Sequence, residues 1–110
     1  MWSSTMGEEN REDYAHPVGK KKPNAWGLYD MQANIEEWCS DWSDKYTEAN
    51  QIDPQGPSSP PAVKFGRPIR ATRGSGWWLD TFYCSSARRG GAWPNDSGDY
   101  VGFRIVVEPE

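Results

Sequence analysis

Glycine and proline interrupt this sequence so often that only short helices and strands fit between them. The 110 residues include eleven glycines and nine prolines. The stretch from Asp53 to Pro61 (DPQGPSSPP) is a turn-rich crossing without a core-forming residue. No long amphipathic run appears elsewhere. The sequence therefore predicts one loop-rich α+β domain, with short antiparallel strands and little helix.

The clearest strand signal lies near the end of the chain. Residues Tyr100–Val107 (YVGFRIVV) are mostly β-branched or aromatic, and Asp99 and Pro109 bound them. Because apolar residues occupy both faces, we expect this strand to be central in its sheet. Arg104 is the exception, and we expect it to meet a carboxylate, since an unpaired buried guanidinium is very costly.

Other segments give weaker signals. Trp38 and Trp42 are spaced i, i+4, which fits a partly helical segment, but a strand through Ile35–Cys39 fits equally well. Val63–Phe65 and Ile69–Thr72 are predicted to be short strands. Hydrophobic residues make up only 35% of the chain, so we expect the core to come from its seven Trp, five Tyr and three Phe.

Composition excludes some classes of partner. A net charge of −4 argues against a phosphate-binding surface, and the short basic run Lys20–Lys22 is expected to be a solvated turn, so no nucleic acid is expected. No apolar stretch approaches the roughly 20 residues of a membrane span. Met1 leads into polar residues, so we expect no signal peptide, and the sequence favours no compartment.

Trp26–Trp42 combines apolar side chains with acids in a single short stretch. It carries three Trp, one Tyr and one Cys, together with Asp30, Glu36, Glu37 and Asp41. Burying the aromatic side chains would also draw in carboxylates, which resist burial without a partner or a metal. The stretch is therefore the first candidate for a site.

The two cysteines, Cys39 and Cys84, are too far apart in sequence for a metal knuckle. They are expected to lie close together, either as a disulfide or as two buried thiols. His16 is the single histidine, and it precedes a proline, which fits a loop hydrogen-bonding role.

Several motifs occur in a characteristic order. They are HPVG, PNAWGLYDM, EWCSDW, DPQGP, an Arg-Gly pair shortly before Trp77, C-x-SA-x-R and VGFR. In this order they resemble the C-terminal half of the formylglycine-generating enzyme family, the sulfatase-modifying-factor domains, whose fold is a variant of the C-type lectin fold. The resemblance implies a domain at residues 16–107, an N-terminal arm at 1–15 and a tail at 108–110.

The resemblance also bears on catalysis. Sulfatase-activating members use a C-x4-C pair that holds copper, but the positions five before and five after Cys84 are Leu79 and Arg89. Gly76 replaces an active-site serine of the family. Related sulfoxide synthases hold iron with several histidines, and this chain has one. We therefore expect neither copper nor iron, and we favour a domain that is not an enzyme.

The resemblance implies calcium instead. Sulfatase-activating members bind this ion in the loop that corresponds to the Trp26–Trp42 stretch. Carried over, the ligands would be the side chains of Asp30 and Glu37 and the carbonyl groups of Ala33 and Ile35. Two carboxylates, two carbonyls and waters are adequate for calcium. The alternative is that Asp30 caps a turn and that Glu37 pairs with an arginine such as Arg104.

The function that we favour is a non-catalytic ligand- or protein-recognition domain, similar to the variable proteins that retroelements diversify. Its ligand surface would comprise residues of types that carry binding energy with little entropic loss: Trp77, Trp78, Asp80, Phe82, Tyr83, Arg88, Trp93, Asn95, Asp99 and Tyr100. The partner would be a protein, a small molecule or a glycan. The alternative is a fragment or subunit of a sulfatase-modifying enzyme whose catalytic part lies outside this chain.

Overall fold

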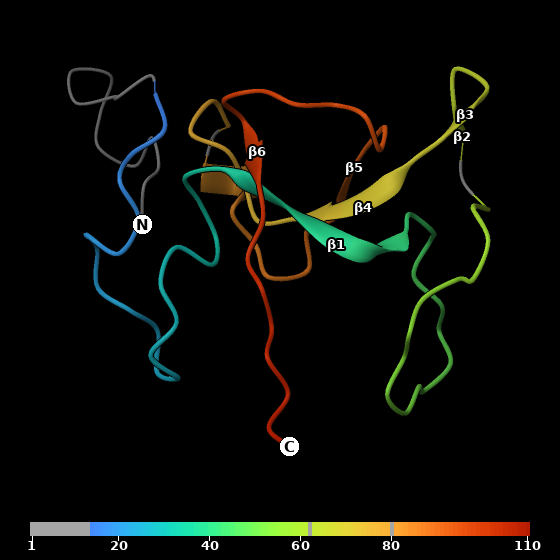
Figure 1. Cartoon of the computed structure of the whole chain (residues 1–110), viewed down its shortest axis with the longest axis horizontal. Helices are drawn as coiled ribbons and strands as arrows, with labels where there is room; N and C mark the ends of the chain where they lie inside the picture. Colours follow the sequence, from blue (N-terminus) through green and yellow to red (C-terminus); the bar gives the residue numbers. More distant parts are fainter. Residues whose placement is uncertain (1–13, 62, 80) are drawn as a thin grey trace.

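The computed structural model describes residues 14–61, 63–79 and 81–110 (Figure 1). The arm predicted at residues 1–15 lies mostly outside these ranges. Asp80, one of the predicted ligand-binding residues, lies outside them as well.

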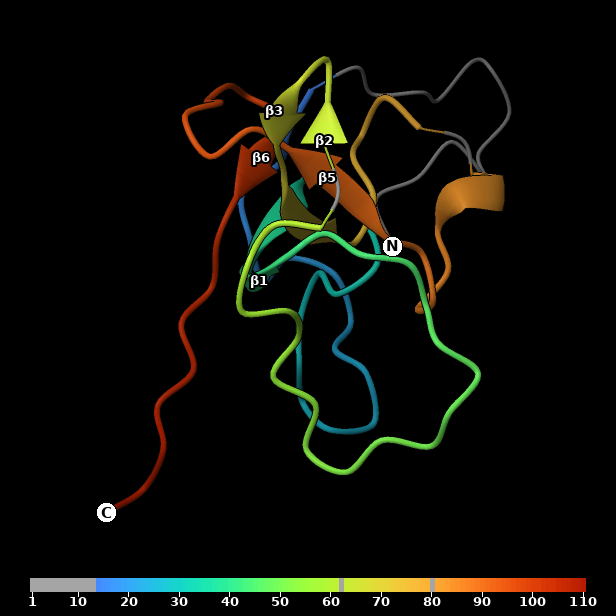
Figure 2. The same cartoon turned by 90° about the vertical axis from the view of Figure 1, so that its right-hand side faces the viewer.

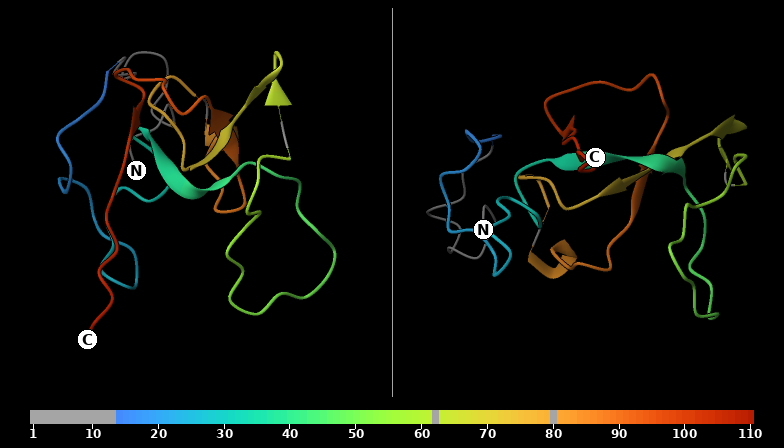
Figure 3. Two further views of the ribbon diagram at one scale, coloured as in Figure 1. Left: turned by 45° about the vertical axis from the view of Figure 1, so that its right-hand side comes forward. Right: turned by 60° about the horizontal axis from the view of Figure 1, so that its bottom comes forward.

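The described residues form short strands joined by long loops. The elements are β1 (Glu36–Trp42), β2 (Val63–Lys64), β3 (Arg67–Pro68), β4 (Arg70–Arg73), the 3-10 helix η2 (Thr81–Tyr83), β5 (Gly90–Ala92) and β6 (Val101–Gly102). Residues 43–61 contain neither helix nor strand and extend away from the sheet (Figure 3). In the part of the chain that the structure describes, no helix is long and apolar enough to cross a bilayer. The predicted loop-rich α+β fold is confirmed.

The main sheet has the strand order β5-β4-β1-β6, and β2 pairs with β3 in a separate hairpin. β1 and β4 are neighbours at the centre of the molecule (Figure 1). They are antiparallel, with Trp38 opposite Thr72 and Trp42 opposite Arg70, and the register shifts between these pairs. Of the two alternatives for this stretch, the strand is correct. Residues an even number apart share a face of a strand, so the spacing of Trp38 and Trp42 does not require a helix.

The predicted strand over Tyr100–Val107 is wrong in length and in position. Only Val101–Gly102 are in a strand, and this strand lies at the edge of the sheet. It runs parallel to β1, whereas every other pairing in the sheets of the described residues is antiparallel. A segment of high strand propensity forms a strand only where a neighbouring strand bonds to it, and among the described residues β6 has such a neighbour on one side only.

The expected aromatic core is also not found among the described residues. The buried hydrophobic residues there are Ala33 and Ala71, and the buried polar ones are Asn34, Thr72 and Ser75. Larger side chains are half-buried or exposed; Trp42, for example, is covered by the Arg70 guanidinium 3.9 Å from its ring centroid. The main sheet encloses small residues where β1 and β4 meet, but the described residues supply no second layer on it to cover large ones.

Candidate functional site

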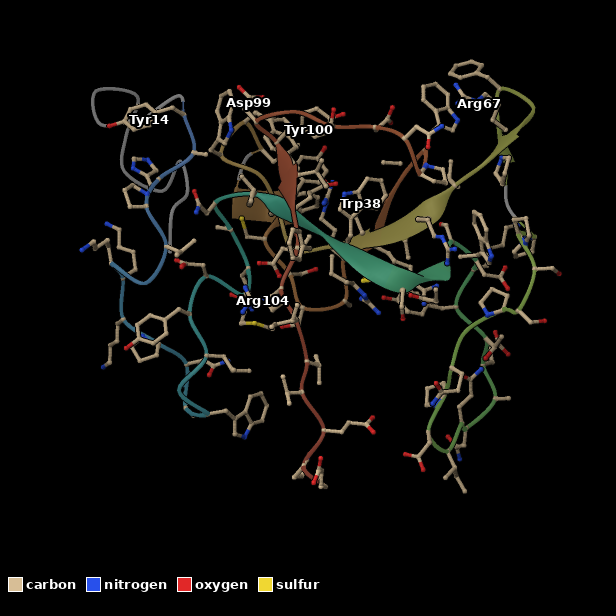
Figure 4. All side chains as sticks on the ribbon, viewed as in Figure 1. Tyr14, Trp38, Arg67, Asp99, Tyr100 and Arg104 are labelled. Carbon is tan, nitrogen blue, oxygen red and sulfur yellow. The ribbon has the colours of Figure 1, made fainter. Side chains whose placement is uncertain are left out.

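The loop between β5 and β6 is fixed by aromatic side chains at both ends. At the end next to β6, Tyr100 packs edge-on against Trp78, with ring centroids 5.9 Å apart, and Trp78 packs edge-on against Trp77 at 5.8 Å. The Trp77 indole nitrogen donates a hydrogen bond to the carbonyl of Asp99 at 3.4 Å. Three of the predicted aromatic ligand-binding residues therefore form one cluster, which lies near β6 where Figure 4 labels Asp99 and Tyr100.

At the other end of this loop, Trp93 lies against the β2–β3 hairpin. Its ring centroid is 6.3 Å from that of Phe65, and the Arg67 guanidinium lies 4.9 Å from the Trp93 ring. The backbone nitrogen of Trp93 also donates to the Asp96 carboxylate at 3.2 Å. Asn95 and Asp99 are exposed between the two ends. The loop is thus irregular in backbone but fixed at both ends.

The most exposed aromatic residues of the predicted surface are on η2. Phe82 is 85% exposed and Tyr83 is 48% exposed. Their rings meet edge-on, with centroids 5.5 Å apart. Leaving two aromatic faces in water is costly for the isolated domain, so this pair is the clearest candidate contact for a ligand.

Arg88 is half-buried and is bonded within the domain. Its guanidinium donates to the Glu36 carboxylate at 2.8 Å and to the Gly74 carbonyl at 3.0 Å. The second carboxylate oxygen of Glu36 accepts from the Thr72 hydroxyl at 2.9 Å. Both members of the ion pair are half-buried, so Arg88 joins the turn before β5 to β1 and β4.

The four predicted calcium-ligating residues, Asp30, Ala33, Ile35 and Glu37, line one cavity of about 450 Å³. Arg104 shares it and donates to both oxygens of the Glu37 carboxylate, each at 2.6 Å. It also donates to the carbonyls of Tyr29 and Asp30, at 3.1 and 3.4 Å. The prediction that Arg104 meets a carboxylate is confirmed.

Asp30 has a second role in this cavity. It adopts a positive φ of 55°, and its carboxylate accepts a hydrogen bond from the backbone nitrogen of Gly19 at 2.8 Å. Donor groups for a cation are therefore present, but both carboxylates already have protein partners. Among the described residues, no group of three or more His, Cys, Asp and Glu side chains could hold a metal ion.

Cys39 and Cys84 are both half-buried, and no disulfide joins them. Burial raises the pKa of the Cys39 thiol, and the negative charge of Asp41 raises it further. Arg73 and Arg89 act in the opposite direction but are outweighed. Cys39 is therefore a protonated, weakly nucleophilic thiol at neutral pH.

Asn34 has a role that sequence reasoning missed. Its buried side chain accepts from the His16 backbone nitrogen at 2.7 Å and donates to the His16 carbonyl at 3.0 Å, while its own carbonyl accepts from Trp77 at 2.8 Å. Its φ is 87°, a conformation that asparagine tolerates better than most residues. That tolerance, together with its place just before a strand, was the available signal.

A second unpredicted group surrounds Tyr46 in the long polar loop. The Arg89 guanidinium lies 4.3 Å from the Tyr46 ring, and Arg73 donates to the Tyr46 hydroxyl at 2.7 Å. The hydroxyl in turn donates to the Ala87 carbonyl. These contacts attach residues 43–61 to the turn before β5. The polar sequence around Tyr46 carries no signal that would have indicated them.

A cavity of about 550 Å³ was not predicted either. It lies between the segment at residues 21–33 and the turn at Ser85 and Ser86, and Lys22, Trp26, Met31 and Arg73 contribute to its wall. Its volume is in the range of small-molecule sites.

Comparisons with known proteins agree with the motifs. The family model for the sulfatase-modifying factor enzyme 1-like domain matches residues 1–109. The formylglycine-generating enzyme of Thermomonospora curvata is 34% identical over 99% of this chain and 38% of its own length.

Among solved structures, Treponema denticola variable protein 1 superposes with a TM-score of 0.74 and 33% identity, covering 93% of this chain and 34% of that one. PvdO from Pseudomonas aeruginosa superposes with a TM-score of 0.65 and 33% identity, covering 88% of this chain and 35% of that one. The chain thus spans little more than a third of the length of these relatives.

Proposed function

The chain belongs to the sulfatase-modifying factor enzyme family, and on that premise we propose that it is a non-catalytic recognition domain whose ligand is a protein. The observation that carries the proposal is the exposed Phe82–Tyr83 pair on η2. The loop of residues 93–100, fixed at both ends, provides a second contact region on the same C-type-lectin-like scaffold.

The chemistry of these two regions suits a protein ligand. Aromatic side chains have few rotatable bonds, so ordering them on binding costs little entropy while each covers a large area. The clusters around Trp78 and Trp93 limit the freedom of the intervening loop before any ligand arrives. A preordered loop loses less entropy on binding, which raises affinity. Asn95 and Asp99 add exposed polar groups for hydrogen bonding.

The similarity to Treponema denticola variable protein 1 supports this reading. We propose that the present chain is a variable protein of the same kind, with its diversified positions in the region from Trp77 to Tyr100. The framework residues there would be Trp78 and Arg88, because their contacts hold the scaffold together.

Copper-dependent oxidation is not part of the proposal. The thiolate pair that the resemblance would require cannot form around Cys84, because Leu79 and Arg89 occupy the relevant positions. A copper(I) site needs soft ligands such as thiolates.

The second candidate function is a piece of a formylglycine-generating enzyme whose catalytic part lies elsewhere. It is favoured by the curated relatives of that name in Thermomonospora curvata and Streptomyces coelicolor, of which this chain covers 38% and 36%.

An oxidation assay separates the two functions. The purified chain is mixed with copper(I), a sulfatase-type cysteine peptide and dissolved oxygen as the oxidant, and aldehyde formation is followed by mass spectrometry. The recognition domain should leave the peptide unchanged. Aldehyde formed by the chain alone would refute the non-catalytic function. Aldehyde formed only after the rest of the Thermomonospora curvata enzyme is added would favour the second candidate.

We also propose that calcium binds weakly in the cavity lined by Asp30 and Glu37. The carboxylates of these two residues and the carbonyls of Ala33 and Ile35 would hold the ion, with waters completing its shell. Arg104 already neutralises Glu37, so calcium would share that carboxylate with a guanidinium. This competition is the reason to expect an affinity in the millimolar rather than the micromolar range.

A further inference from the structure

The wall of the cavity of about 550 Å³ carries an excess of positive charge. It includes three basic residues, Lys21, Lys22 and Arg73. Asp30 is the one acid among the described residues that line it, and its carboxylate accepts a hydrogen bond from the Gly19 backbone nitrogen at 2.8 Å. The chain as a whole has a net charge of −4, so the cavity is a basic site on an acidic protein. A concave surface of this charge attracts an anionic ligand.

The same wall carries apolar side chains that are open to water. Trp26 is 86% exposed, Leu28 is 45% exposed and Met31 is 40% exposed. They belong to a loop that lies below the sheet in the blue-to-teal part of Figure 2. An indole ring left in water is costly for the isolated domain, and a flat aromatic ligand stacked on it would remove that area from water.

Arg73 has one edge of its guanidinium available. Its hydrogen bonds to the Tyr46 hydroxyl and to two backbone carbonyls all use Nη1, at 2.7 to 3.4 Å. Among the described residues, its Nε and Nη2 have no hydrogen-bond partner. Arg104 uses the corresponding edge, Nε and Nη2, to hold both oxygens of Glu37. The available edge of Arg73 therefore matches the geometry of a ligand carboxylate.

Hydrogen bonds fix the wall before any ligand arrives. The side-chain carbonyl of Asn24 accepts from the backbone nitrogens of Trp26 and Leu28, each at 3.0 Å. Gln32 joins this loop to the turn before β5, because its Nε2 donates to the Ser86 hydroxyl at 3.0 Å. A site ordered in this way loses less entropy when it binds a ligand.

We propose that this cavity binds a small aromatic carboxylate. The carboxylate pairs with the Nε and Nη2 edge of Arg73. Lys22, which has no ion-pair partner among the described residues, adds a second positive charge. The ring stacks on Trp26 and packs against Met31. This inference is independent of the protein ligand proposed at η2, because none of the residues predicted for that surface lines this cavity.

NMR titration of the isotope-labelled chain with indole-3-acetate tests the proposal. Saturable shifts are expected at residues 22–33, Arg73 and Ser86, with a dissociation constant of about 1 mM, as is usual for a ligand of this size. Indole-3-acetamide keeps the ring without the charge, and acetate keeps the charge without the ring, so each should bind at least tenfold more weakly. Equal binding of the amide, of acetate or of inorganic phosphate would overturn the proposal. Saturable shifts centred elsewhere, or none in this cavity, would overturn it as well.

Matched variants make the test specific. Trp26→Ala should weaken binding at least tenfold, because the stacking surface is lost. Lys22→Ala should weaken it about threefold, whereas Lys20→Ala, two residues away and outside the wall, should leave it unchanged. Arg73→Lys keeps the charge but loses the planar fork, and it should weaken binding at least tenfold. Trp26 and Lys22 are exposed, so their variants should keep the wild-type melting temperature. Unchanged binding by Trp26→Ala or Arg73→Lys, or equal effects of the two lysine variants, would overturn the proposal.

Discussion

Arg104 donates through Nε and Nη2 to the two carboxylate oxygens of Glu37, at 2.6 Å in each case. This pair joins the chain just after β6 to β1, and Figure 4 shows Arg104 below the two strands. The hydrogen bond that Arg104 donates to the Glu37 carboxylate raises the pKa of Arg104, and the charges of Glu37 and Asp30 add to the effect although burial opposes it. The guanidinium therefore stays charged throughout the usable pH range.

Replacing Arg104 should destabilise the fold without affecting η2. For Arg104→Met we expect the free energy of unfolding to fall by about 1–2 kcal/mol, because two charge-assisted hydrogen bonds are lost at a partly exposed site. Arg104→Lys keeps the charge and should lose less. Urea unfolding measures both, with the exposed Lys20→Met as control. Equal stability of the Met variant and the wild type would show that the pair contributes nothing.

Asn34 should be among the residues most sensitive to substitution. Asn34→Ala removes two side-chain hydrogen bonds to His16 and places a Cβ-bearing residue without a polar side chain at φ 87°, so about 2–4 kcal/mol should be lost. Asn34→Gly relieves the backbone strain and should lose clearly less. Asn50→Ala, in the exposed loop, is the matched control. If the Ala and Gly variants were equally stable, the backbone contribution would be absent.

Calcium should stabilise the domain modestly. If the dissociation constant is about 1 mM, 5 mM calcium adds about 1 kcal/mol and raises the melting temperature by about 4–8 °C relative to chelator. Asp30→Ala should abolish this shift. Equal melting temperatures of the wild type with calcium and with chelator would contradict calcium binding. The carboxylates of Asp30 and Glu37 would then be satisfied by the Gly19 hydrogen bond and by Arg104 alone.

Cys39 should make stability fall at alkaline pH. Its pKa is raised in the folded state, chiefly by burial, so folding favours the neutral thiol. The stability that the neutral thiol contributes is complete below the ordinary thiol pKa of about 8.5. It is lost as the pH rises through the raised pKa of the folded state. The unfolding free energy of the wild type should therefore decline above about pH 8.5, more steeply than that of Cys39→Ala. Identical pH profiles would contradict the shift.

The parts of the fold that the sequence predicted are those set by local chemistry. The turn-rich stretch from Asp53 to Pro61 and the short strands near Val63 and Ile69 depend on residue type and immediate neighbours. The pairing of Arg104 with a carboxylate could be predicted from the cost of an unpaired guanidinium, although its partner Glu37 is distant in sequence. The motif order also identified the family, because several motifs at the right spacing constrain each other.

The predictions that were wrong concern features that depend on contacts between residues distant in sequence. The apolar pattern of Tyr100–Val107 predicted a central strand, but a pattern cannot say whether a neighbouring strand is available. The aromatic residues were expected to be buried, but burial requires a second layer that the described residues do not supply. Similarly, the inward position of Arg88 follows from Glu36, which is 52 residues away.

The most direct test of recognition at η2 is the affinity of selected ligands for variants of this site. A random-peptide phage library would be selected on the immobilised chain, and enriched clones would be titrated against Phe82→Ala/Tyr83→Ala and the exposed control Ile52→Ala. The account predicts that the double variant keeps its melting temperature but binds these clones at least tenfold more weakly, while the control binds them normally. Failure to enrich any clone, or equal binding to the double variant and the wild type, would contradict it.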